Sequence, residues 1–173
     1  MLIRKVTCLL LLLASLSASA QGTAYSRPPV TTAADVEAIM QVTVDFRSAL
    51  SRKDVPALTA LLLSENILFT SPPPPSFAKR KREQGQPRFT GAEPGGFAGF
   101  SAFVASSTVQ LQAKFYNIKI TQDGHLAWVS FDFEFLAGEK IENYGVESWQ
   151  LLKTADEQWK ILSVVWSSHG APK

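Results

Sequence analysis

The sequence is almost free of cysteine. Its single cysteine, Cys8, lies inside an apolar N-terminal stretch that we expect to be removed. A chain without cysteine forms neither a disulfide nor a thiolate metal site, so its stability has to come from a buried core. The remainder, about 150 residues, is a common length for one domain and is enough to bury such a core.

An excess of charge of one sign is also missing. The chain carries 17 basic and 15 acidic residues, and Arg4 and Lys5 belong to the segment expected to be removed, which leaves 15 of each sign. A chain with a formal net charge of zero has no electrostatic footprint for nucleic acid. We therefore expect no nucleic-acid partner.

No apolar run reaches the roughly 20 residues that a membrane-spanning helix needs. The longest, Val6 to Leu16, follows the basic residues Arg4 and Lys5 and precedes the small residues Ala18-Ser19-Ala20. This order is typical of a signal peptide. We predict that residues 1–20 are cleaved, that the protein is periplasmic or secreted, and that it keeps no stable membrane anchor.

Helical patterns dominate the first half of the remaining chain. From Ala33 to about Arg52, apolar residues recur at steps of three and four, which predicts an amphipathic helix. Asp54 followed by Pro56 predicts the start of a short second helix. Ile67 to Thr70 is typical of a strand, and Phe97 to Ser106 of a further helix.

Two segments show no periodicity. Residues 21–32 are polar and contain two prolines, so we expect a flexible lead-in. Residues 71–96 hold four consecutive prolines, Pro72 to Pro75, and the basic run Lys79 to Arg82. A loop of this length is usually a lid or disordered. The basic run suits phosphate or an anionic membrane surface, but it stands alone without interleaved aromatics, and we interpret it as a solvated loop.

The last third predicts a four-stranded antiparallel meander. Asp123-Gly124 is a strong signal for a two-residue hairpin turn. Apolar residues change parity near Phe115-Tyr116, which predicts a β-bulge there. The expected strands are Val109 to Thr121, His125 to Leu136, Ile141 to Lys153 and Trp159 to Ser168.

Four-residue loops at the last two hairpins would fix the register of this sheet. Side chains alternate between the two faces of a strand. On this register the helix-facing side carries Val129, Phe131, Phe133, Tyr144, Val146, Ser148, Gln150, Ile161, Ser163 and Val165. The outer side carries Trp128, Trp149, Leu162, Val164 and Trp166, an apolar patch that predicts a homodimer through the outer face, centred on the three tryptophans.

Three stretches resemble the nuclear-transport-factor-2-like superfamily, which includes the SnoaL-like proteins. They are Asp54 to Leu58 leading into Ile67 to Thr70, Asp123 to Ala127, and Trp159 to Ile161 with Trp166 to Ser168. The likeness covers Ala33 to His169, so we expect one SnoaL-like domain at 33–169 and a short tail at 170–173. It implies a cone-shaped α+β (cystatin-like) fold, in which N-terminal helices pack on a strongly bent antiparallel sheet around a pocket.

The resemblance does not select an activity, because this superfamily includes isomerases, cyclases, dehydratases, ligand-binding proteins and assembly domains. Its enzymatic members use a buried Asp, Glu or His. Members that end in this way often carry His where this chain has Ser163 and Val165. We therefore lean against catalysis and name no catalytic residue.

The predicted pocket lining is Phe131, Phe133, Tyr144, Ser148 and Ser163, a mostly apolar set with a few hydroxyls. Such a set is typical of a pocket for a small, partly apolar ligand. The same residues are equally suited to fill a core. An isomerase or dehydratase, or a dimeric assembly domain without ligand, is the alternative function.

The titratable residues give no stronger signal. We expect Asp45, Glu142 and Glu147 to be solvated, with Glu147 on the outer face. An enzyme would need a carboxylate that the helices bring inward. His125 and His169 are isolated in the sequence, so we predict no metal site and no cofactor.

Overall fold

The computed structural model describes residues 32–73, 75–90 and 95–170. The predicted signal peptide, all of the lead-in except Thr32, and the last three residues of the tail lie outside the described residues. Within the described part, no helix is long and apolar enough to cross a membrane.

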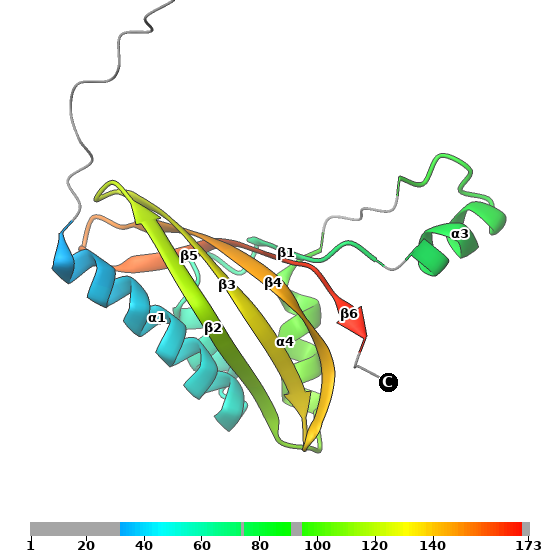
Figure 1. Cartoon of the computed structure of the whole chain (residues 1–173), viewed down its shortest axis with the longest axis horizontal. Helices are drawn as coiled ribbons and strands as arrows, with labels where there is room; N and C mark the ends of the chain where they lie inside the picture. The colour runs from blue at the N-terminus through cyan, green and yellow to red at the C-terminus, as the bar shows by residue number, and fades with distance from the viewer. Residues whose placement is uncertain (1–31, 74, 91–94, 171–173) are drawn as a thin grey trace, which may run out of the picture.

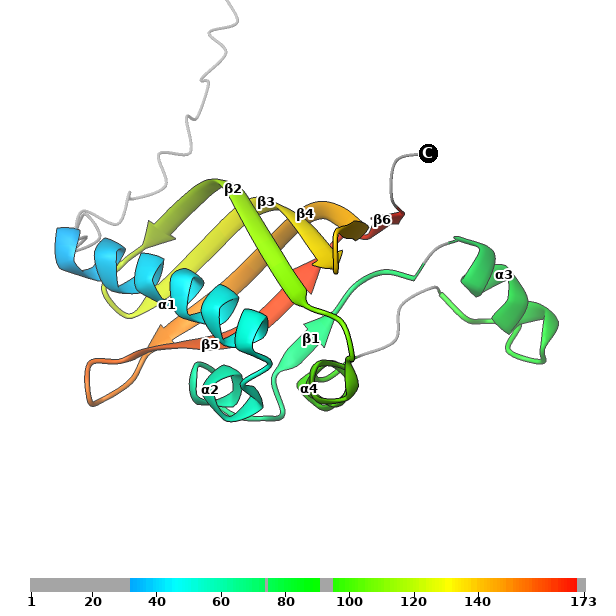
Figure 2. The ribbon, with the colours of Figure 1, turned by 90° about the horizontal axis from the view of Figure 1, so that it is seen from below.

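The fold is one curved sheet with helices on one side (Figures 1 and 2). The strand order is β1-β5-β4-β3-β2, with β6 beside β4, and β1 is parallel to β5 while the other pairs are antiparallel. The expected α+β fold is thus confirmed, except that the parallel β1 makes the sheet mixed and not wholly antiparallel. The elements are α1 (Ala33–Arg52), α2 (Val55–Ala60), β1 (Leu68–Thr70), α3 (Pro75–Glu83), α4 (Phe97–Ser106), β2 (Leu111–Gln122), β3 (Leu126–Ala137), β4 (Lys140–Lys153), β5 (Trp159–Trp166) and β6 (His169–Gly170).

The first two helices begin where the sequence predicts. Thr32 caps α1 by accepting a hydrogen bond from the backbone N–H of Asp35, and Lys53 ends it in the left-handed conformation. Asp54 caps α2 by accepting from the N–H of Ala57, with Pro56 in the first turn. The buried side of α1 faces the sheet and contributes Ile39, Val42, Thr43, Phe46, Ala49 and Leu50 to the core.

The segment 71–96 is not the continuous loop that the prolines predict. Residues 75–83 form α3, which begins at Pro75, a residue that is well tolerated in the first helical turn. The basic run lies in this helix, and Lys79 pairs with Glu83 at 3.8 Å. Figures 1 and 2 both place α3 away from the sheet.

The meander is confirmed with all four predicted strands, and a hairpin lies at Asp123-Gly124. The predicted two-residue turn was wrong, because His125 also belongs to the loop and Gln122 pairs with Ala127. The predicted bulge in β2 is also present, because the pairing of β2 with β3 shifts between Tyr116 and Lys119. Asn117 takes a positive φ of 53° there. Phe115 and Ile118 pack against the core on either side of it, whereas Tyr116 is exposed.

The predicted register between β3 and β4 was wrong by one residue. Val129 pairs with Trp149, Phe131 with Glu147, and Phe133 with Gly145. The cause is a second bulge, since the pairing shifts between Phe135 and Leu136 and leaves Glu142 as the extra residue of β4. One inserted residue exchanges the two faces of a strand.

The register between β4 and β5 is also shifted. Lys153 pairs with Trp159 across a loop one residue longer than expected, and Leu162 is an extra residue on β5. Ile161 therefore stays in the core as predicted, while Val164 turns inward instead of outward.

These shifts relocate the tryptophans that were predicted to form a dimer patch. Trp149 has no exposed surface and Trp166 faces the interior, so both were assigned to the wrong face. Trp128 is 44% exposed, as predicted. The homodimer stays a prediction.

The two tryptophans allow a direct check of the register. We expect Trp149→Ala to lower the free energy of unfolding by about 3–5 kcal/mol, because it removes a large side chain from a closed core. Trp128→Ala is the matched control and should cost less than about 1 kcal/mol. Urea unfolding measures both, and equal losses would restore the predicted register.

Candidate functional site

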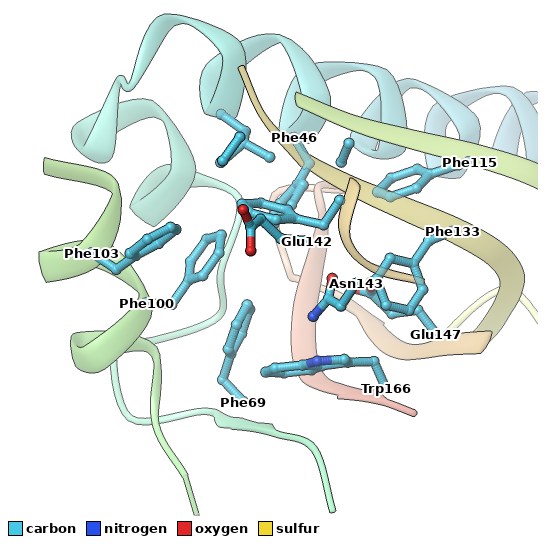
Figure 3. A pocket seen from close by; sticks show the side chains of 14 residues that line it. Phe46, Phe69, Phe100, Phe103, Phe115, Phe133, Glu142, Asn143, Glu147 and Trp166 are labelled. Atoms are coloured by element: carbon cyan, nitrogen blue, oxygen red, sulfur yellow. The ribbon is translucent and has the colours of Figure 1, made fainter. Parts of the chain in front are cut away.

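A cavity of about 470 Å³ lies between the sheet and the helices α1 and α4 (Figure 3). Its volume falls within the range of roughly 300–1,000 Å³ that is usual for small-molecule sites. The lining combines aromatic rings with a few small and polar side chains. It comprises Phe46, Leu50, Phe69, Phe100, Phe103, Ala113, Phe115, Phe133, Phe135, Ala137, Glu142, Asn143, Glu147 and Trp166.

The aromatic rings of the lining hold one another in place. The ring centroid of Phe69 on β1 lies 4.8 Å from that of Phe100 on α4 and 5.1 Å from that of Trp166 on β5. Phe46 on α1 stacks on Phe100 at 6.2 Å. Rings at these separations attract one another beyond the burial of their area, so four elements are tied together around the cavity.

Of the five residues predicted to line a pocket, Phe133 does so. Phe131 lies in the core, 4.1 Å from Phe115 between ring centroids. Tyr144 and Ser148 are exposed on the outer face, because the bulge at Glu142 reverses β4. Ser163 also lies on that side of the sheet, where its hydroxyl donates to Gln150 Oε1 at 3.1 Å.

The polar centre of the site is Glu147, which was expected on the outer face and in solvent. It lines the cavity and is only 8% exposed. The indole N–H of Trp149 donates to its Oε1 at 2.6 Å. Burial raises the pKa of the Glu147 carboxyl to about 7, and the hydrogen bond from Trp149 offsets this only in part. No basic side chain of the described residues pairs with it.

Trp149 fixes the position of this carboxylate. Its ring packs against Phe46 at 5.0 Å, Phe131 at 5.1 Å and Phe115 at 5.7 Å between centroids. Residues 147 and 149 lie two apart on one strand and so project from the same face. A rigid indole thus holds Glu147 at the boundary between core and cavity.

Two further polar side chains come from the bulge in β4. Glu142 lies at the rim, exposed and 3.1 Å from Lys140. Asn143 donates from Nδ2 to Ser168 Oγ at 3.3 Å, and its buried Oδ1 has no hydrogen-bond partner among the described residues. The bulge explains why two consecutive residues both reach the cavity.

A second buried carboxylate, Asp35, shows the contrasting arrangement. It also accepts an indole N–H, from Trp159 at 3.1 Å, but Lys153 lies 3.1 Å away and Thr32 donates to its other oxygen. The Thr32 hydroxyl, then Lys153 and the Trp159 indole, hold the pKa of Asp35 below its usual value. Asp35 joins the start of α1 to the last hairpin and is fully paired.

The two histidines lie apart from the cavity. His169 on β6 packs against Tyr144, with 5.5 Å between ring centroids, and His125 follows the first hairpin turn. Across the described ranges, no three His, Cys, Asp or Glu side chains gather in a way that would hold a metal ion.

No family model and no curated protein matches the sequence. Several solved structures match the fold. A protein from Streptomyces avermitilis, named a "putative dehydratase from the NTF2-like family", is 21% identical, with 80% of this chain and 98% of that chain covered and a TM-score of 0.54. A cystatin-like protein from Nostoc punctiforme is 16% identical, with 80% and 93% covered and a TM-score of 0.56.

A third structure, named a "putative aromatic ring hydroxylase" from Novosphingobium aromaticivorans, is 15% identical, with 82% and 96% covered and a TM-score of 0.57. These identities establish the fold alone. The chain has the nuclear-transport-factor-2-like, cystatin-like fold, which confirms the resemblance drawn from its sequence.

The raised pKa of Glu147 predicts a pH dependence of stability. The pKa of the Glu147 carboxyl is 4.5 in the unfolded chain and about 7 in the folded protein. Its contribution to the free energy of unfolding is therefore complete below pH 4.5 and is lost as the pH rises to about 7. The loss is on the order of 3 kcal/mol. We expect Glu147→Gln to be more stable than the wild type at pH 8 and similar to it at pH 4.5.

Denaturant unfolding at both pH values measures the difference between the two proteins, in which contributions of other groups cancel. Glu142→Gln at the exposed rim is the control and should follow the wild type at both pH values. A constant difference between wild type and Glu147→Gln across this range would contradict the buried, raised carboxyl.

Proposed function

We propose that the protein binds a small, largely apolar ligand of one or two rings in the cavity. The observation that carries this is the lining, which contains seven phenylalanines and Trp166 around about 470 Å³. Apolar surface moved out of water contributes roughly 25 cal/mol per Å². A flat, apolar molecule gains both this term and contacts with the ring faces.

The cavity is supported without a ligand. Phe69 contacts both Phe100 and Trp166 directly, and Phe46 packs against the buried Trp149. A ligand that enters a preformed site does not have to order the side chains around it, which favours affinity. The name of the Novosphingobium aromaticivorans protein refers to an aromatic ring, which agrees with a site of this kind.

Filling the cavity tests the proposal. Ala113 lies on β2 within the lining, and Ala113→Phe should place a ring in the space and weaken binding of a neutral naphthalene dye such as prodan at least about tenfold. Fluorescence titration measures the affinity. Ser148→Phe on the outer face is the control and should leave it unchanged, with circular dichroism confirming that both variants fold.

Wild-type protein that fails to bind any one- or two-ring neutral probe would contradict the proposal. Equal affinities for the wild type and Ala113→Phe would place the bound dye elsewhere on the molecule.

A second candidate function, a proton-transfer enzyme of the isomerase or dehydratase kind, is favoured by Glu147. A general acid or base works best when its pKa lies near the working pH, and burial brings that of Glu147 to about 7. The carboxylate would take a proton from a carbon beside a carbonyl of the ligand. In an isomerase, the same carboxyl would then return the proton to the ligand. In a dehydratase, it would keep the proton while the ligand loses hydroxide.

Deuterium exchange distinguishes this enzyme from a binding protein. We expect the wild type to accelerate exchange of the carbon-bound protons of 2-tetralone in D₂O, as followed by NMR, and Glu147→Gln to lose about 100-fold or more of that rate. Prodan binding by Glu147→Gln should stay within a few-fold of the wild type. No acceleration by the wild type would leave binding as the function.

Two further proposals rest on the sequence. We propose export of the protein to the periplasm or the medium, from the pattern of residues 1–20. We also propose a homodimer through the outer face of the sheet. The apolar side chains available there are Leu68, Tyr116, Trp128, Val146 and Val165.

A further inference from the structure

The charged groups in the lining of the cavity are all of one sign. Glu147 lies in its interior and Glu142 at its rim, and no lining residue that the structure describes is basic. Asn143 also lines the cavity, but its Nδ2 donates to Ser168 and its Oδ1 is buried without a partner among the described residues, so neither atom adds charge to the site. The indole N–H of Trp166 is the remaining side-chain donor. The site therefore offers acceptors and negative charge.

Glu147 also lacks the partner that the other buried carboxylate has. Asp35 and Glu147 each accept one indole N–H, but Asp35 has Lys153 at 3.1 Å and Glu147 has no cation among the described residues. Burying an ionised carboxylate without a counter-charge is costly. A cationic group on the ligand would give Glu147 a counter-charge, as Lys153 does for Asp35.

The rings of the lining favour the same ligand. The faces of Phe and Trp rings carry partial negative charge and attract ammonium groups, with an effect that grows when water is excluded. Phe69, Phe100 and Trp166 lie along one side of the cavity, and Phe115 and Phe133 along the other (Figure 3). Both the polar and the aromatic parts of the lining thus suit a positive charge.

We propose that the ligand is a small arylalkyl amine, in which the amino group is carried on a carbon outside the ring. Its ammonium group binds the Glu147 carboxylate while its rings fill the cavity. This inference rests on the proposed binding function and names the class of its ligand. An anionic ligand of the same shape would be repelled by Glu147 and Glu142. A neutral alcohol would keep the hydrogen bond and lose the ionic attraction.

Three probes of one shape test the proposal: 2-naphthylmethylamine, 2-naphthylmethanol and 2-naphthoate. Calorimetric titration of the wild-type protein, purified in its exported form at pH 7.5, should give an affinity for the amine at least about tenfold above that for the alcohol. The carboxylate should bind most weakly. This order needs no variant and stands even if a substitution in the cavity prevents folding.

Matched variants then locate the preference. Glu147→Gln keeps an oxygen for the Trp149 N–H and should bring the amine to the affinity of the alcohol, while the alcohol changes by less than about threefold. Glu142→Gln should keep most of the preference for the amine, because Glu142 is exposed and paired with Lys140.

The outcomes separate the two proposals. Equal binding of amine and alcohol by the wild type would overturn the ligand class and leave the proposed function standing. Binding of none of the three would overturn both. A preference for the amine that survives Glu147→Gln would overturn the assignment of the cation to Glu147.

Discussion

Glu142, the extra residue of β4, decides which side of that strand faces the helices, and the site depends on that choice. Its insertion moves every residue from Asn143 to Leu152 to the opposite face relative to a regular hairpin. Trp149 enters the core, Glu147 enters the cavity, and Tyr144, Val146 and Ser148 turn outward. Without the bulge, the cavity would be lined by two hydroxyls and a valine and would hold no buried acid.

The core and the site are joined through one indole. Trp149 is enclosed by Phe46, Phe115 and Phe131, so its N–H has a fixed direction, and Glu147 is the acceptor that this direction selects. A buried N–H without an acceptor is costly, and this requirement explains why a polar residue stands at position 147. The packing that stabilises the fold therefore also fixes the position of the Glu147 carboxylate, through its hydrogen bond to Trp149.

Most of the elements follow from local signals in the sequence, whereas the site does not. Periodicity and capping residues predict α1, α2, α4 and the four long strands, and the change of parity at Phe115-Tyr116 predicts the bulge in β2. The bulge in β4 has no such signal, because Glu142 and Asn143 are both polar and leave the pattern of that end unchanged. From the sequence, Glu147, Trp149 and Leu151 could lie on either face of the sheet. The pairing of β4 with Val129 and Phe131 is what places them on the side of the helices. The run of prolines predicted a loop where α3 forms, because proline is as compatible with the first helical turn as with a loop.

The fold does not require a glutamate at position 147, where a glutamine would fit equally well. A glutamine would accept the same indole N–H and would carry no charge into the interior, so the carboxyl costs stability at neutral pH that the fold does not need to lose. At Asp35, Lys153 and the Thr32 hydroxyl offset the cost of burying an ionised carboxylate. The same fold therefore contains a buried acid that is paired. Glu147 instead lies unpaired, among the described residues, beside an aromatic cavity, where the proposed ligand would supply the missing partner. Stability given up at one residue is the usual mark of a binding or catalytic group, and Glu147 is for this reason the residue on which both proposals for the cavity rest.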